Sequence, residues 1–205
     1  MRAAIIGCGR TGRKRSQALS GCRLTVCCDT LGDRAQAPAK AAAGAVARTD
    51  WQAAVNRPDV DVMLVAATHD MLARIACAAA ATGKHVLMEK PGARRTAELD
   101  PVRAAASRTS VRVRVGFNRR YHRALPKTRE ILDSGALGDM MFVRGRYGHA
   151  GRPGYDKEGR AFAALAGGGE LVDQGMRLID LARWFLADFE KVQGHIATLG
   201  AFCGR

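Results

Sequence analysis

Residues 3–12, which read AAIIGCGRTG, decide the fold. The first four are apolar and end at Gly7, a pattern typical of a buried strand that enters a tight turn. Residues 13–19 are compatible with a helix. Gly7, Gly9 and Gly12 therefore fit the spacing G-x-G-x-x-G between a strand and a helix. In this arrangement the first glycine makes the turn, the second lets the backbone approach a pyrophosphate, and the third lets the helix pack on the strand.

A second apolar run, Arg23–Cys28, is followed by an acid, Asp29, 22 residues after Gly7. A carboxylate at this place suits the ribose hydroxyls of NAD and would repel the 2′-phosphate of NADP. Arg34 lies nearby and keeps NADP open as an alternative cofactor. We therefore predict a dinucleotide site that favours NAD; the alternative is a purely structural glycine turn.

The rest of the first half alternates strand and helix signals. Predicted strands cover residues 45–47, 60–66 and 85–88, and predicted helices cover residues 35–43, 50–55 and 71–81. Such alternation indicates βαβ units, and hence an α/β fold with a parallel sheet covered by helices.

The second half reads differently, and we place a boundary near Gly116. Here the pattern predicts strands at 111–115, 140–146 and 192–199, a helix at 124–134, and a helix that follows the glycines at 167–169. Because residues 117–205 end soon after the last of these strands, we expect an incomplete α+β domain after a complete first domain at residues 1–116.

The composition is that of an ordinary globular protein with an unusual charge. Of 205 residues, 47% are hydrophobic and 25% charged, and 33 Lys and Arg against 19 Asp and Glu give a net charge of +14. A polyanion binder is therefore one hypothesis, and it has a basic cluster to support it: Arg112, Arg114, Arg119, Arg120 and Arg123. The arginines are nevertheless scattered through every segment, and only 5% of residues are aromatic. We expect an arginine-rich surface without a specific nucleic-acid partner.

Other classes are excluded by what the sequence lacks. No apolar stretch approaches the roughly 20 residues that span a bilayer, and the first apolar run ends too soon for a signal peptide. The six cysteines form no CxxC pair and have no histidine at metal-ligand spacing. We expect no metal, no membrane partner, free thiols and a cytoplasmic location.

Two further segments carry groups suited to catalysis. Lys90 follows the predicted strand at 85–88, at the edge where open α/β sheets place ligands, and could donate a proton or position a substrate. The alternative is an exposed lysine at a strand end. Asp173, Arg177 and Asp180 are four and three positions apart and share a helical face, so an intrahelical ion pair is the alternative there.

Together these segments resemble the Gfo/Idh/MocA family of oxidoreductases. The resemblance rests on the glycine fingerprint at 7–12, on GKHVLMEKP at 83–91, on GFNRRY at 116–121 and on GGGELVDQGMRLIDLARWF at 167–185. It implies an N-terminal Rossmann domain, a C-terminal α+β domain with an open mixed sheet, NAD(P) as cofactor, and hydride exchange with sugars, cyclitols or related hydroxy compounds.

The resemblance also implies roles for individual residues. Lys90, in the Glu89-Lys90-Pro91 motif, would lie close to nicotinamide and substrate, with Pro91 fixing the turn, often through a cis bond. Asp173 would orient the substrate or the proton-transfer group. Thr68 and His69 would lie near the nicotinamide, although His69 could equally be a surface histidine. The residues that would bind the cofactor are Gly7, Gly9, Arg10, Thr11, Gly12, Asp29, Thr68, His69, Glu89 and Lys90.

The sequence departs from the family pattern at three places. The family usually has a histidine four residues after Asp173, and this chain has Arg177. Arginine stays protonated and cannot accept an alcohol proton, but it could clamp a carboxylate or phosphate of a substrate or hold the Asp173 charge. Gly159 stands where a bulky aromatic residue is expected. Family members also continue well past this length, and a sheet cut short has an open edge that favours self-association.

Three hypotheses follow. The first is an oxidoreductase in which Lys90 assists proton transfer while Asp173 and Arg177 hold the substrate. The second is a catalytically impaired nucleotide-binding paralogue or fragment, and the third is the polyanion binder.

Overall fold

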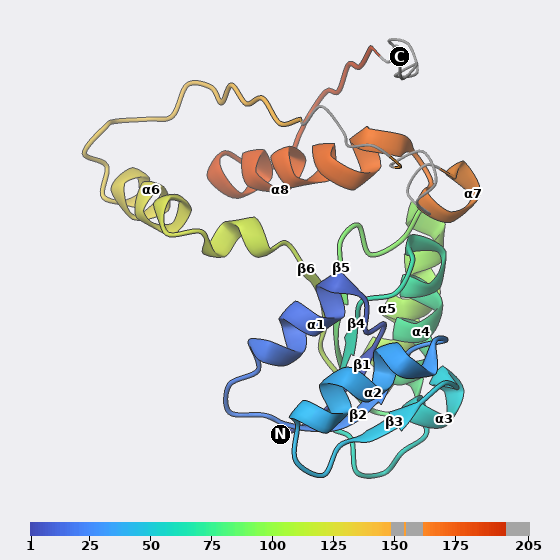
Figure 1. Cartoon of the computed structure of the whole chain (residues 1–205). Helices are drawn as coiled ribbons and strands as arrows, with labels where there is room; N and C mark the ends of the chain where they lie inside the picture. The colour runs from blue at the N-terminus through green and yellow to red at the C-terminus, as the bar shows by residue number, and fades with distance from the viewer. Residues whose placement is uncertain (149–153, 155–161, 196–205) are drawn as a thin grey trace.

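The computed structural model of the chain describes residues 1–148, 154 and 162–195. Its first part alternates strands and helices along the chain (Figure 1). The strands are β1 (Arg2–Ile6), β2 (Arg23–Cys28), β3 (Val46–Arg48), β4 (Val62–Val65), β5 (His85–Glu89) and β6 (Val113–Gly116). The helices are α1 (Arg10–Gln17), α2 (Gly32–Ala41), α3 (Trp51–Val55), α4 (His69–Ala81) and α5 (Asp100–Thr109).

The six strands form one parallel sheet in the order β3-β2-β1-β4-β5-β6. The α/β fold predicted from the alternating pattern is thereby confirmed. Strand order reverses between β1 and β4, so the loops after these two strands diverge to opposite faces of the sheet. Such a switch point leaves a crevice at the carboxyl ends of the strands, where this class of sheet binds ligands.

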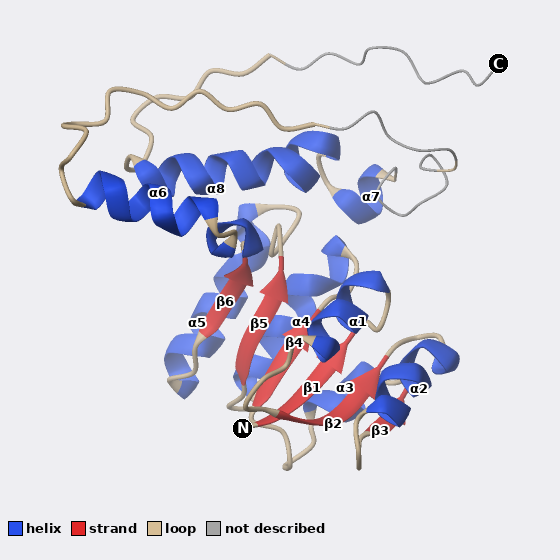
Figure 2. Ribbon diagram, turned by 60° about the vertical axis from the view of Figure 1, so that its left-hand side comes forward, coloured by secondary structure: helices blue, strands red, loops and turns tan. Residues whose placement is uncertain are grey.

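Both faces of the sheet are buried. On β1, Ala4 and Ile6 join an apolar cluster with α3, α4 and α5, whereas Ala3 and Ile5 face the side covered by α1 and α2. Figure 2 shows the two helical layers in front of and behind the strands. Strands covered on both faces read as continuous apolar runs, which explains why these segments were recognisable in the sequence.

One helix of this domain was not predicted. Helix α5 follows a 3₁₀ turn at Thr96–Leu99 and has Pro101 in its first turn. Its own residues Val102 and Ala105 form its buried face. Proline at the start of a helix and apolar residues three positions apart are both recognisable helix signals, and they were present in the sequence.

The second region lies above the carboxyl ends of the strands (Figure 2). It contains a 3₁₀ turn at Asn118–Tyr121, α6 (Ala124–Asp133), α7 (Ala163–Ala166), a π-helical turn at Leu171–Gly175 and α8 (Met176–Phe185). The predicted helices at 124–134 and after the triple glycine are confirmed. The second of them opens with the π turn before it becomes α-helical.

The predicted strand at 140–146 is wrong, because residues 140–148 form no regular element. Met141 and Phe142 are 86% and 71% exposed. A strand needs a neighbour for its backbone hydrogen bonds, and no described segment pairs with this one. Of the strand predicted at 192–199, residues 192–195 are not a strand, and the rest lies outside the described residues, as does Gly159. None of the described helices is long and apolar enough to cross a bilayer.

Candidate functional site

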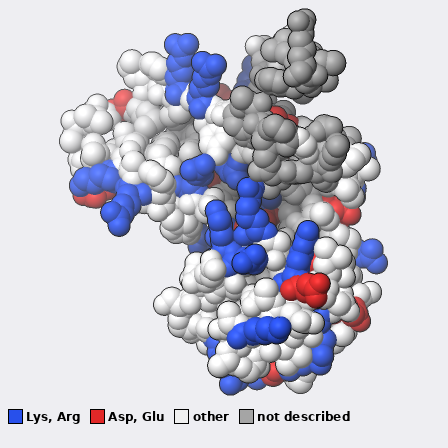
Figure 3. Space-filling model, viewed as in Figure 1, with Lys and Arg blue, Asp and Glu red and all other residues white. Residues whose placement is uncertain are grey.

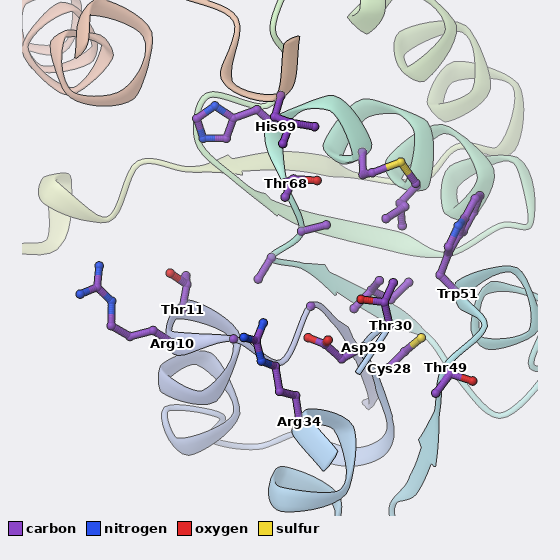
Figure 4. A pocket seen from close by; sticks show the side chains of 18 of the residues that line it. Arg10, Thr11, Cys28, Asp29, Thr30, Arg34, Thr49, Trp51, Thr68 and His69 are labelled. Carbon is purple, nitrogen blue, oxygen red and sulfur yellow. The ribbon is translucent and has the colours of Figure 1, made fainter. Parts of the chain in front are cut away.

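A cavity of about 420 Å³ opens at the switch point between β1 and β4 (Figure 4). Its walls come from the loops that follow β1, β2, β3 and β4 and from α7 above them. The lining residues from the first three of these loops are Gly7, Gly9, Arg10, Thr11, Asp29, Thr30, Arg34, Thr49 and Trp51. Those from the fourth loop, α4 and α7 include Ala66, Ala67, Thr68, His69, Met71, Leu165 and Ala166.

The three glycines of the fingerprint do three different things. Gly7 has φ +91°, and a Cβ there would lie 2.4 Å from the Ala66 carbonyl oxygen. A Cβ on Gly12 would lie 1.8 Å from the Gly7 carbonyl oxygen, so only glycine lets α1 approach the strand this closely. Gly9 differs from both, because a Cβ there would meet nothing within 4 Å and the residue lines the cavity. The open space at Gly9 is the cradle that a pyrophosphate would fill.

Positive charge surrounds this loop. Helix α1 begins after Gly9 with no side-chain cap and no acid in its first turn, so its first backbone N–H groups are available to an anion. A neighbouring hollow beside the same loop is lined by Arg10, Arg13, Lys14 and Arg34. Figure 3 shows Lys and Arg side chains gathered over the region of α1. The loop and its surroundings suit phosphate groups.

Asp29 is fixed at the cavity by two backbone hydrogen bonds. Its Oδ2 accepts from the amide of Cys8 at 2.8 Å, and its Oδ1 accepts from the amide of Leu31 at 3.0 Å. Each carboxylate oxygen can accept a further hydrogen bond, so ribose hydroxyls remain suitable donors. Arg34 lines the same cavity (Figure 4), and the alternative cofactor with a 2′-phosphate therefore has a cation within the site.

His69 links the cavity to the second region. It is the first residue of α4, and its Nδ1 lies 3.0 Å from the carbonyl oxygen of Ala166 in α7. Because a carbonyl only accepts, Nδ1 carries the proton and Nε2 is left as the acceptor in the neutral ring. His69 is half-buried in the cavity wall.

Lys90 is buried, so the alternative of an exposed lysine is wrong. Its Nζ donates to the Asp173 carbonyl oxygen at 2.8 Å and forms an ion pair with the Asp173 carboxylate. The two side chains are 9% and 4% exposed, and 83 positions separate them in sequence. The Lys90–Pro91 peptide bond is cis. Just before it, Glu89 accepts from Arg15 Nε of α1 at 2.7 Å, which fixes the end of β5.

The alternative for the second helix, an ion pair among Asp173, Arg177 and Asp180, does not form among the described residues. The other oxygen of Asp173 accepts from Gln174 Nε2 at 3.1 Å, and Gln174 Oε1 accepts from Arg177. Asp180 instead pairs with Arg120, at 2.6 and 2.8 Å. Lys90 and Arg120, which come from other elements, thus pair with the two carboxylates, and neither carboxylate pairs with Arg177.

The structure therefore arranges the predicted site residues in two groups. The cavity brings together most of the residues assigned to the dinucleotide: Gly7, Gly9, Arg10, Thr11, Asp29, Thr68 and His69. Gly12, Glu89 and Lys90 do not line it. Lys90 instead begins a chain of polar contacts that continues through Asp173 and Gln174 to Arg177.

Sequence reasoning missed several participants. Gln174 directly follows Asp173, so its position in the motif was a usable signal. Tyr147, which lies against the Arg177 guanidinium, had none, because only the folded chain brings residues 147 and 177 together. Among the described residues no three His, Cys, Asp or Glu side chains gather as metal ligands, and five described cysteines are free.

Comparisons with known proteins agree with this geometry. Residues 1–117 match the family model "Oxidoreductase family, NAD-binding Rossmann fold", and residues 126–201 match "GFO/IDH/MocA C-terminal domain". The inositol 2-dehydrogenase of Salmonella paratyphi B is 33% identical over 73% of this chain and 46% of its own length. The levoglucosan dehydrogenase of Pseudarthrobacter phenanthrenivorans is 31% identical over 73% of this chain and 39% of its own length.

A solved structure of a levoglucosan dehydrogenase in complex with NADH and levoglucosan superposes with a TM-score of 0.84. It is 26% identical, and the match covers 92% of this chain and 54% of that one. The chain thus spans about half the length of the relatives it matches. The parallel sheet, the fingerprint glycines and the two matched models lead to one conclusion: this chain belongs to the Gfo/Idh/MocA family of oxidoreductases.

Proposed function

We propose that this protein is an NAD(P)-dependent oxidoreductase that exchanges a hydride with a sugar, a cyclitol or a related hydroxy compound. The observation that carries the proposal is the buried Lys90–Asp173 pair, which joins the residue after β5 to the second region above the sheet. The same sheet carries the nucleotide-type cavity. The names of the relatives, inositol and levoglucosan dehydrogenases, support the substrate class.

The proposal includes a division of labour between residues 1–116 and residues 117–205. The first part would hold the dinucleotide, with Gly9 and the start of α1 at the pyrophosphate and Asp29 at the ribose hydroxyls. The open space at Gly9 and the two free acceptor positions of Asp29 support this fit. Asp29 favours NAD, and Arg34 keeps NADP as the alternative. A cytoplasmic location and self-association stay predictions from the sequence.

When bound, the nicotinamide ring supplies hydride exchange with the substrate carbon. Lys90 handles the proton: as an ammonium it donates a proton from Nζ to the carbonyl oxygen that becomes an alcohol, and in oxidation it takes that proton back. Asp173 orients Lys90 through its carboxylate and backbone carbonyl. Arg177 stays charged and takes no part in proton transfer, so its role is to hold the substrate.

The test is NAD reduction by the full chain with a panel of sugars and inositols. Replacing a general acid–base group lowers the rate about 10²–10⁴-fold, so Lys90→Ala should lose at least about 100-fold in kcat. Lys40→Ala, at an exposed position on α2, is the matched control and should retain the wild-type rate. Unchanged turnover in Lys90→Ala would show that the proposed role is wrong.

Nucleotide binding without turnover is the second candidate, and Arg177 in place of the usual histidine favours it. The variant Arg177→His separates the two. Activity gained by this variant from an inactive wild type, with NAD bound by both, would identify a nucleotide-binding protein whose catalytic site is impaired.

A further inference from the structure

We propose that the substrate of this site carries an anionic group, a carboxylate or a phosphate, and that Arg177 and Arg119 bind it. This inference rests on the proposed oxidoreductase function and narrows its substrate class to acidic polyols. It starts from two arginines whose positive charges a neutral polyol would not neutralise.

Arg177 is an arginine with few partners. Its Nη1 donates to Gln174 Oε1, and its guanidinium carbon lies 5.6 Å from the centre of the Tyr147 ring. Its Nε is buried and has no hydrogen-bond partner among the described residues. A guanidinium has five N–H donors in a planar fork, so Arg177 keeps donors on its Nη atoms beyond the one that Gln174 takes.

A second arginine shares the same aromatic ring. The guanidinium carbon of Arg119 lies 5.5 Å from the centre of Tyr147, and its Nη2 donates to the Tyr147 hydroxyl at 2.7 Å. Tyr147 thus contacts both guanidinium groups. An anion that reaches this ring would meet the positive charge of both arginines.

Other arginines that contact the second region do have carboxylate partners. Arg94 pairs with Glu98 at 2.8 Å, and Arg120 pairs with Asp180 at 2.6 Å. Within the described part of the chain, neither Arg119 nor Arg177 forms an ion pair with a carboxylate. The two arginines on Tyr147 therefore supply positive charge that the described side chains do not neutralise.

The arginine pair is connected to the reacting end of the site. Arg177 contacts Gln174, Gln174 contacts the Asp173 carboxylate, and the same carboxylate holds Lys90. Because Asp173 neutralises Lys90, the end of this chain at Lys90 suits an uncharged carbinol or carbonyl group. The other end suits an anion. A polyol with one acidic group matches this asymmetry, and arginine reads such a group with paired hydrogen bonds.

Calorimetric titrations of the full chain in the presence of NADH test the proposal with matched ligands. Glucose is compared with glucuronate and with glucose 6-phosphate, which differ from it at one carbon. Hydrogen bonds to a charged group correspond to about a 10- to 150-fold change in affinity. We expect at least one acidic ligand to bind at least about 10-fold more tightly than glucose, with an affinity that falls as salt is added.

Two variants with the same change in net charge locate the effect. Arg177→Gln should abolish the preference for the acidic ligand. Arg103→Gln, at an 81% exposed position on α5, should keep it. If Arg177→Gln does not fold, Arg119→Gln, at an exposed position, serves in its place and should weaken the same preference.

Equal affinities for acidic and neutral ligands, or an acidic preference that survives both arginine replacements, would overturn the inference. A failure of the proposed function has a different signature. In that case NADH itself would give no binding heat and would not raise the unfolding temperature, whatever the sugars do.

Discussion

Different interactions stabilise the two regions of this chain. In residues 1–116 the strands and helices bury two apolar clusters, one on each face of the sheet. In the described part of the second region, Ala166 is the one buried apolar side chain, and the other buried residues are Asp173, Gln174 and Asp180. The first region has a packed apolar core, whereas ion pairs with buried carboxylates hold the second region in place.

This difference connects stability with function. Lys90 and Asp173 both fasten the second region to the sheet and form the centre of the proposed catalytic site. Arg120 and Asp180 fasten α8 to the turn that follows β6. The scaffold for the nucleotide can therefore be rigid, while the contacts that hold the substrate side are charged and depend on solvent, salt and pH.

The largest expected effect comes from opening a cavity in the packed core. Leu72 in α4 is fully buried, and Leu72→Ala should lower the free energy of unfolding by about 3 kcal/mol. Leu137 in the second region is 70% exposed, and Leu137→Ala should change it by less than about 0.5 kcal/mol. Urea unfolding measures both. Similar losses in the two variants would contradict the contrast between the regions.

A smaller and local effect is expected in the second region. Hydrogen bonds to Asp180 raise the pKa of Arg120, and Arg120→Gln leaves that 7% exposed carboxylate without its cation. Arg120→Gln should lower the local stability of the second region by about 2 kcal/mol. This loss is smaller than for a fully buried pair because Arg120 is one-third exposed. Hydrogen exchange should accelerate in α8 and stay unchanged in β1 and β4. Faster exchange throughout the sheet would show that the two regions unfold as one unit.

The smallest effect concerns the partly exposed ion pair between Arg2 and Asp61 in the first region. Hydrogen bonds from Arg2 lower the pKa of Asp61 to about 2. A carboxylate with a lowered folded-state pKa stabilises the protein above its unfolded pKa of about 4, and this contribution disappears as pH falls towards 2. The stability difference between wild type and Asp61→Asn should therefore be present at pH 6 and shrink below about pH 4. If the stability difference between the two proteins did not change with pH, the Asp61 carboxylate would not be its source.

The sequence predicted the first region well because its signals are local. Apolar runs located all six strands to within two residues at each end. Helix α5 was missed although Pro101 marked its start. The strand predicted at 140–146 was wrong because a run such as Met140–Val143 becomes a strand only beside a partner, and none of the described segments pairs with it.

The site was predictable in part for the same reason. The spacing of the glycines and Asp29 is local, and the cavity brings them together. The contact between Lys90 and Asp173 spans 83 positions and depends on how the π-helical turn at Leu171–Gly175 lies over the sheet. Both residues could be singled out as candidates from the sequence, but neither periodicity nor composition could pair them. The stacking of Arg177 on Tyr147 had no counterpart in the sequence.

The most direct test is thermal unfolding of the full chain with and without NAD, in wild type and in Gly9→Ala. NAD at about 100 times its dissociation constant adds about 2.7 kcal/mol, which should raise the midpoint of wild type by roughly 5–11 °C. The Cβ in Gly9→Ala meets no protein atom within 4 Å and occupies part of the open space where Gly9 lines the cavity. This variant should therefore unfold at the wild-type temperature without NAD and show little shift with it. No shift in wild type, or an equal shift in both proteins, would contradict the account.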